Sequence, residues 1–147
     1  MLKVFLAGFL SWALVGASAA AEPGSAKPVP AAEARAVRAV VQAQLDALAA
    51  DDAVRAFSFA SPSIRQQFGD ARTFMNMVRQ AYPMIVRPAA VGFFVPLSED
   101  GAIVQVVQLR DRAGAAWRAV YELRQQPDKT WRVNGCSVVP DNGAATT

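Results

Sequence analysis

The stretch AWRAVYELRQQPDKTWRVNGCSVV, residues 116–139, decides the fold class of this chain. Residues 116–125 alternate in the way that is typical of a β-strand with one buried face. Pro127-Asp128-Lys129-Thr130 is typical of a turn, and residues 131–139 are again rich in strand-forming residues. The stretch therefore predicts two antiparallel strands joined by a short turn. The apolar face of the first strand should carry Trp117, Ala119, Tyr121 and Leu123.

The second of these strands is interrupted by Asn134-Gly135. This dipeptide often forms a hairpin turn, but here it lies inside an apolar run with no room for a further strand. We therefore interpret it as a β-bulge that bends the strand. We expect one face of this strand to carry Trp131, Val133, Gly135, Ser137 and Val139.

Residues 103–110 and 90–97, further toward the N-terminus, form two more β-rich segments. Ser98-Glu99-Asp100-Gly101 separates them, and its Asp-Gly pair is a strong turn signal. Pro96 cannot donate a ladder hydrogen bond, so it indicates an edge strand or a bulge. These segments extend the hairpin to a four-stranded, or slightly larger, antiparallel meander.

Residues 31–81 have helical periodicity instead. The longest helix is expected over residues 31–50. Helices followed by hairpin-connected strands predict an α+β fold, in which one layer of N-terminal helices packs on a curved, cone-like antiparallel sheet. A single domain over residues 31–140 accounts for these elements. The later helices are marked by their start and stop signals: one after Asp51-Asp52, one from Ser61-Pro62 to Gly69, and one from Asp70 to Pro83.

The first 21 residues have the order of a secretory signal peptide. Lys3 supplies a positive charge, residues 4–17 are mostly apolar, and small residues crowd at 17–21. The apolar run is shorter than the ~20 residues of a membrane span, so we expect cleavage, export and no stable membrane anchor afterwards. We expect a flexible linker over residues 22–30 and a disordered tail over residues 141–147.

The composition excludes several classes of function. There is no histidine, which removes the commonest general base and most zinc sites, and we expect neither a metal nor a cofactor. The single cysteine, Cys136, excludes an internal disulfide. The 15 Lys and Arg residues are interspersed with 12 Asp and Glu residues, so no basic stripe predicts nucleic-acid binding.

Several motifs of the chain resemble those of a family of exported bacterial proteins of unknown function, over about residues 36–140. The family is in turn similar to the nuclear-transport-factor-two-like, or SnoaL-like, superfamily. That similarity implies helices and sheet arranged as a cone around a pocket, but neither an activity nor catalytic residues. The resemblance also implies the bacterial periplasm as the compartment. The motifs are Asp51-Asp52 after a long helix, Phe68-Gly69-Asp70, Tyr82-Pro83 and the closing run Trp131-Arg132-Val133-Asn134-Gly135-Cys136.

A pocket between the sheet and the helices would draw on the few aromatic and reactive side chains. Tyr121 could donate a hydrogen bond there, or be a core aromatic whose hydroxyl is satisfied. Cys136 could be a nucleophile, although the chain has no histidine to lower its pKa. It could also be a small buried side chain or form an intermolecular disulfide at an edge. Arg87 could hold an anionic group at the rim, or lie exposed in a connector. The candidate pocket residues are Phe74, Tyr82, Arg87, Trp117, Tyr121 and Cys136.

These residues favour a non-catalytic protein that binds a small apolar molecule or a partner protein. The alternative is a cyclase- or isomerase-like enzyme, in which a carboxylate base and a tyrosine donor meet in the pocket. A homodimer formed through the open face of the sheet is compatible with either function. The candidate bases, none of which stands out from ordinary capping or surface carboxylates, are Asp46, Asp51, Asp52 and Glu122.

Overall fold

The structure is a computed structural model and describes residues 26–143. The expected signal peptide, residues 1–21, lies outside the described residues, as do residues 22–25 and 144–147. The described chain forms helices first and then an antiparallel sheet, which confirms the predicted α+β fold.

The helical part begins with α1 (Ala31–Ala49), α2 (Ala53–Ser58), α3 (Pro62–Phe68) and α4 (Ala71–Ala81), and it ends in a single 3-10 turn, η1 (Pro83–Ile85). The boundaries agree with the prediction, and short-range capping by side chains sets the starts of α2, α3 and α4. Gly69 ends α3 with a φ of 81°, in the left-handed region that glycine favours. The capping side chains each accept a backbone N–H: Asp52 from Arg55, Ser61 from Ile64, and Asp70 from Thr73.

The sheet has six strands in the order β1-β3-β4-β5-β6, with β2 also paired to β4. β4, β5 and β6 form the antiparallel meander that the sequence predicts. Between β3 and β4, Asp100 and Gly101 both have positive φ angles, 49° and 78°, as the predicted Asp-Gly turn requires. The strands are β1 (Lys27–Pro28), β2 (Ala90–Phe93), β3 (Leu97–Glu99), β4 (Ala102–Arg110), β5 (Ala116–Gln125) and β6 (Trp131–Pro140).

The first strands differ from the expectation in two respects. The expected strand over residues 90–97 is divided into β2 and β3, and residues 94–96 between them belong to neither strand. Pro96, which has no N–H for the ladder, lies in this interruption. Lys27 and Pro28, within the expected flexible linker, pair with β3.

The predicted bulge in β6 is confirmed. Glu122 of β5 pairs with Gly135, while the next residue, Leu123, pairs with Val133. Asn134 is therefore an extra residue in β6. Because successive side chains of a strand point to opposite faces, one extra residue reverses the faces beyond it.

This reversal makes the expected face of β6 wrong in its C-terminal half. Cys136 and Val138 pack against the core, whereas Ser137 and Val139 are exposed on the other face. The alternation predicted for β5 is confirmed without a shift, since Ala119, Tyr121 and Leu123 are buried. The sequence predicts both the bulge and a continuous alternation, and only the bulge is present.

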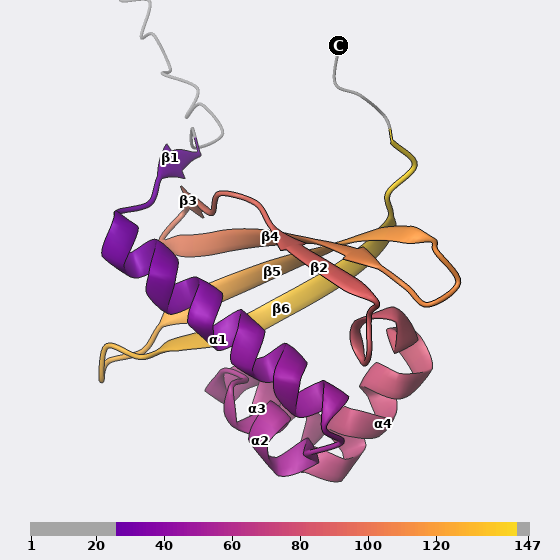
Figure 1. Cartoon of the computed structure of the whole chain (residues 1–147). Coiled ribbons are helices and arrows are strands. Elements are labelled where there is room, and N and C mark those ends of the chain that lie inside the picture. The colour runs from indigo at the N-terminus through magenta and orange to yellow at the C-terminus, as the bar shows by residue number, and fades with distance from the viewer. Residues whose placement is uncertain (1–25, 144–147) are drawn as a thin grey trace, which may run out of the picture.

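The helices cover one face of the sheet (Figure 1). α1 runs across the strands, while α2, α3 and α4 gather at one end of the molecule. No helix within residues 26–143 has both the length and the apolar composition that crossing a membrane requires. The core between the two layers includes Val37, Val41, Leu45 and Leu48 from α1, and Val107, Ala119, Tyr121 and Leu123 from the sheet.

Candidate functional site

A cavity of about 250 Å³ lies between the helices and the inner face of the sheet. α4 and the residues that follow it contribute one wall, and β5 and β6 contribute another. The candidate residues that meet here are Phe74, Tyr82, Tyr121 and Cys136. Most of the remaining lining is apolar and includes Leu48, Ala60, Ile64, Phe68, Met77, Val78, Ile85 and Val133.

Tyr121 contributes an unsatisfied polar group to this cavity. Its side chain lies on β5 and is 1% exposed, and its hydroxyl has no hydrogen-bond partner in the described chain. Leaving a buried polar atom unpaired costs about 1–3 kcal/mol. Burial raises the pKa of Tyr121 well above its ordinary value, and the neighbouring Cys136 thiol, whose sulfur is only a weak acceptor for the phenol, adds to this effect. The phenol therefore keeps its proton and can donate a hydrogen bond to an acceptor in the cavity.

Cys136 lies beside Tyr121, because the two residues are register partners across β5 and β6. Burial raises the pKa of the Cys136 thiol to about 12. At neutral pH this side chain is therefore a protonated thiol rather than a nucleophilic thiolate. Its role in the cavity is that of a small apolar side chain with a weak donor, which fits the interpretation of Cys136 as a small buried residue.

Carboxylates lie away from this cavity. Within residues 26–143, no Asp or Glu lines it, and its amide side chains are Gln44 and Gln67. Gln44 Nε2 donates to the backbone oxygen of Ala56. The same range contains no group of three or more Cys, Asp or Glu residues that could hold a metal ion. The candidate bases are engaged elsewhere: Asp46 with Gln42, Asp51 with Arg79, Asp52 with the backbone of Arg55, and Glu122 with Asn134 and Arg124.

The two remaining candidates, Arg87 and Trp117, lie in a separate, open groove of about 570 Å³. The turn η1 separates the groove from the cavity. Ile85 of this turn lines the cavity, whereas Pro83 and Met84 line the groove. The structure therefore divides the predicted pocket residues between two sites.

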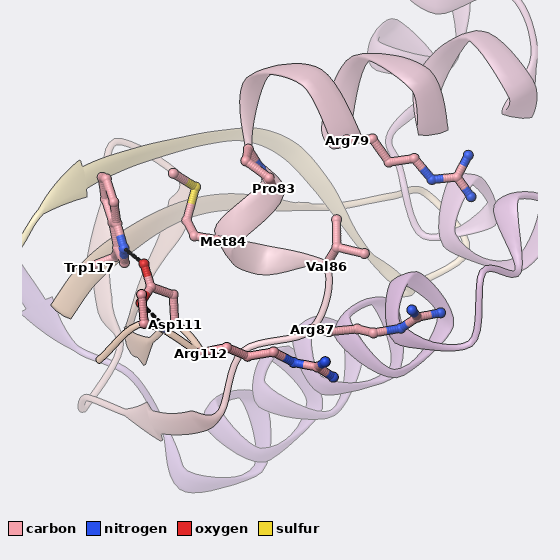
Figure 2. Close-up of a pocket in the computed structure, with 9 residues that line it drawn as sticks. Arg79, Pro83, Met84, Val86, Arg87, Asp111, Arg112 and Trp117 are labelled. Atoms are coloured by element: carbon pink, nitrogen blue, oxygen red, sulfur yellow. Dashed lines mark hydrogen bonds between the residues drawn. The ribbon is translucent and has the colours of Figure 1, made fainter. Parts of the chain in front are cut away.

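The groove combines an apolar floor with a basic end (Figure 2). Met84 and Val86 lie along its middle, and Trp117 and Asp111 lie at one end. Toward the other end are the guanidinium groups of Arg79, Arg87 and Arg112.

Asp111, the one carboxylate that lines the groove within the described chain, is held by three donors. Its Oδ2 accepts from Trp117 Nε1 at 2.9 Å, and its Oδ1 accepts from the backbone N–H groups of Ala113 and Ala115 at 3.0 and 2.9 Å. The bond from Trp117 and then that from Ala115 lower the pKa of Asp111, which is therefore ionised at neutral pH. This carboxylate fixes the turn between β4 and β5 and the orientation of the indole.

Sequence reasoning missed part of both sites. Gln44 lies on the buried stripe of α1 beside Val41 and Leu48, and a polar residue on such a stripe was the signal that could have found it. Asp111 and Arg112 belong to the turn between β4 and β5. A turn signal in the sequence does not reveal whether its side chains line a groove.

The fold and the site together define a small α+β domain with an apolar cavity between its helices and its sheet. Residues 30–146 match the family described as a domain of unknown function, DUF4864, and the chain belongs to this family. The match confirms the part of the resemblance that pointed to a family of unknown function. No curated protein and no solved structure matches the chain.

Proposed function

We propose that this protein binds a small, mostly apolar molecule in the cavity between its helices and its sheet. The observation that carries the proposal is the Tyr121 hydroxyl, which is fully buried beside the cavity without a hydrogen-bond partner. Polar groups that are buried in native proteins are generally satisfied. A ligand with one acceptor atom, such as a carbonyl or ether oxygen, would satisfy this one.

The size and lining of the cavity limit the ligand. An apolar cavity of about 150 Å³ in another protein accommodates benzene, so about 250 Å³ suits a molecule of one or two rings or a short branched chain. The apolar lining supplies affinity through burial. Phe68 and Phe74, whose rings meet edge to face with centroids 5.8 Å apart, provide an aromatic wall.

Binding without catalysis is the activity that these residues support best. The alternative mechanism needs a carboxylate base beside the tyrosine, and within the described chain the lining provides amides, a thiol and phenols instead. The high pKa of Cys136 also argues against covalent chemistry at neutral pH. The cavity therefore supports recognition of a neutral molecule rather than its conversion.

A matched pair of ligands tests this function. Cyclohexanone and methylenecyclohexane have nearly the same shape, but only the ketone has an oxygen that can accept from Tyr121. We expect both to bind, as followed by NMR titration. Tyr121→Phe should weaken the binding of the ketone relative to the hydrocarbon about three- to tenfold, which is the effect of one neutral hydrogen bond. Tyr82→Phe, the same change at the other tyrosine of the cavity, should have a much smaller effect.

A second variant locates the binding. Cys136→Leu adds bulk beside Tyr121 and should weaken the binding of both ligands by reducing the cavity volume. If Tyr121→Phe leaves the ratio of the two dissociation constants unchanged, the hydroxyl does not contact the ligand. If Cys136→Leu leaves both affinities unchanged, the ligands bind outside the cavity, and the proposal is wrong.

We further propose that the protein is exported, to the periplasm, and that its domain is related to the nuclear-transport-factor-two-like superfamily. Residues 1–21 support the first proposal by their pattern, and the helical layer, sheet and cavity support the second.

Native mass spectrometry of protein recovered from the exported fraction tests cleavage. A mature chain beginning at Ala20 or Glu22 is expected, with a small-molecule adduct if the ligand is retained. A dimer in the same spectrum would favour the partner hypothesis, for which the half-exposed Phe94 and Val139 are candidates.

A further inference from the structure

We propose that the groove on the other side of η1 is a second binding site, which takes a small amphiphilic anion: a carboxylate on a short apolar chain. The inference goes beyond the proposed function, because the groove and the cavity share no lining residue in the described chain. Three observations support it: the charge of the groove's arginines, its apolar floor, and the contacts that order its side chains before a ligand binds.

The basic end of the groove has two cations without a carboxylate partner. Arg79 is paired with Asp51. Arg87 and Arg112 form no ion pair within residues 26–143, and both also line a smaller pocket of about 340 Å³ next to the groove. Arginine presents several N–H donors in a planar arrangement that matches a carboxylate. Two such groups that line the same recess favour an anion between them.

The one acidic side chain in the groove's described lining forms no ion pair with these arginines. Asp111 directs its oxygens to the indole of Trp117 and to the backbone of its own turn. Asp46, at the neighbouring pocket, accepts from Gln42 instead of an arginine. The cations at the groove are therefore available to a ligand.

The apolar part of the groove determines the rest of the ligand. Met84 and Val86 are half-buried and lie between the arginines and Trp117 (Figure 2). A volume of about 570 Å³ falls within the usual range of small-molecule sites, roughly 300–1,000 Å³. An inorganic anion would leave this floor uncovered, whereas a carboxylate with a chain of several carbons would cover it and still reach the arginines.

Two of the groove's side chains are held in position before any ligand binds. Arg87 Nε donates to the backbone oxygen of Ala49, the last residue of α1, at 2.9 Å. This contact holds the guanidinium through its Nε, and the terminal nitrogens form no hydrogen bond within residues 26–143. Trp117 is oriented by its bond to Asp111. Such ordering lowers the entropy that binding would otherwise cost.

Octanoate is the probe, and 1-octanol and inorganic phosphate are its matched controls. The full chain is titrated with each by calorimetry, and the indole N–H signal of Trp117 is followed by NMR. We expect octanoate to shift this signal and to bind at least about tenfold more tightly than either control, because only octanoate uses both the arginines and the floor. Increasing salt should weaken octanoate binding.

Three variants assign the contacts. Arg112→Gln alters an exposed turn residue, and the double variant Arg87→Gln with Arg112→Gln removes both free cations. The double variant should weaken octanoate binding about tenfold or more. Arg35→Gln, which removes the same charge from the exposed N-terminal part of α1, should leave octanoate binding unchanged.

Several results would overturn the assignment. They are equal affinities for octanoate and octanol, phosphate binding as tight as octanoate binding, or a double variant that behaves like Arg35→Gln. An acidic peptide that binds at the same arginines more tightly than octanoate would assign the groove to a protein partner instead. Tyr121→Phe should not alter octanoate binding, so failure of this proposal is distinguishable from failure of the cavity proposal.

Discussion

Tyr121 and Cys136 are paired across β5 and β6, and their side chains border the same cavity. The Tyr121 hydroxyl and the Cys136 thiol are polar groups in a mostly apolar lining, and burial keeps both of them protonated. Their pairing depends on the bulge at Asn134, because a regular strand of the same sequence would point Cys136 away from the core. The cavity, its donor and the bulge therefore form one structural unit, and each can be tested separately.

Removing the Tyr121 hydroxyl should not destabilise the ligand-free protein. Tyr121→Phe eliminates a buried group that has no partner, so we expect the free energy of unfolding to stay the same or rise by about 1 kcal/mol. Urea unfolding of the two proteins measures the difference, and Tyr82→Phe serves as the control at a half-buried tyrosine. A loss of more than about 1 kcal/mol would mean that the hydroxyl has a partner in solution.

Cys136 should react slowly with thiol reagents. A pKa of about 12 leaves very little thiolate at pH 8, so we expect alkylation by iodoacetamide to be on the order of a thousandfold slower than for an exposed cysteine. The rate should rise to that of a free thiol when the protein is unfolded in urea. Fast labelling of the native protein, or a disulfide-linked dimer on a non-reducing gel, would contradict this expectation.

Asn134 should matter more for stability than its partly exposed position suggests. Its Oδ1 accepts from the hydroxyls of Ser61 and Ser63 at 2.9 and 3.2 Å, and its Nδ2 donates to Glu122 Oε1 at 3.1 Å. Asn134→Ala removes all three bonds and should lower the free energy of unfolding by about 1–3 kcal/mol. Asn76→Ala is the control on an exposed face of α4, where alanine is the better helix former. Equal effects of the two substitutions in urea unfolding would show that the Asn134 bonds contribute nothing.

Stability should decline as the pH falls below about 4.5. The hydrogen bond from Asn134, and then that from Arg124, lower the pKa of Glu122 from its ordinary value of 4.5. The unfolded chain therefore takes up this proton first, so the contribution is present above pH 4.5 and is lost as the pH falls through the folded-state pKa. The carboxyls of Asp70, Asp111, Asp128 and Asp141 have lowered pKa values as well and act in the same direction.

Glu122→Gln measures how much the Glu122 carboxyl alone contributes to the pH dependence of stability. Thermal unfolding between pH 3 and 6 should show a smaller decline for this variant than for the wild type, because a neutral amide takes up no proton. Glu99→Gln makes the same change at an exposed residue that forms no hydrogen bond or ion pair within residues 26–143. A wild-type slope in Glu122→Gln would show that the Asn134 contact does not affect the titration.

The elements that depend on local interactions could be predicted from the sequence. The caps at Asp52, Ser61 and Asp70 each involve a residue only three positions away. The starts of these helices can therefore be recognised from short sequence motifs. The same holds for the Asp100-Gly101 turn and for the alternation of β5. These features determine the fold class without knowledge of any long-range contact.

The features that depend on distant residues were harder to predict. The short strand at Lys27-Pro28 exists because β3 lies beside it, and nothing in two such residues favours a strand. Likewise, no local pattern places Tyr82 in the cavity and Pro83 in the groove, although the two are adjacent in the chain. The sequence therefore yields the candidate residues of both sites but not their separation by η1.

The bulge also makes the two faces of β6 sensitive to the number of residues in the strand. Deleting Asn134 itself would leave Cys136 and Val138 facing the core, but inserting one further residue beside it, without a second bulge, would turn Ser137 and Val139 inward and Cys136 and Val138 outward. A loop between two strands tolerates changes of length far better, because loop closure depends only weakly on length. An added residue in this part of β6 would therefore disturb the core as directly as a substitution inside it.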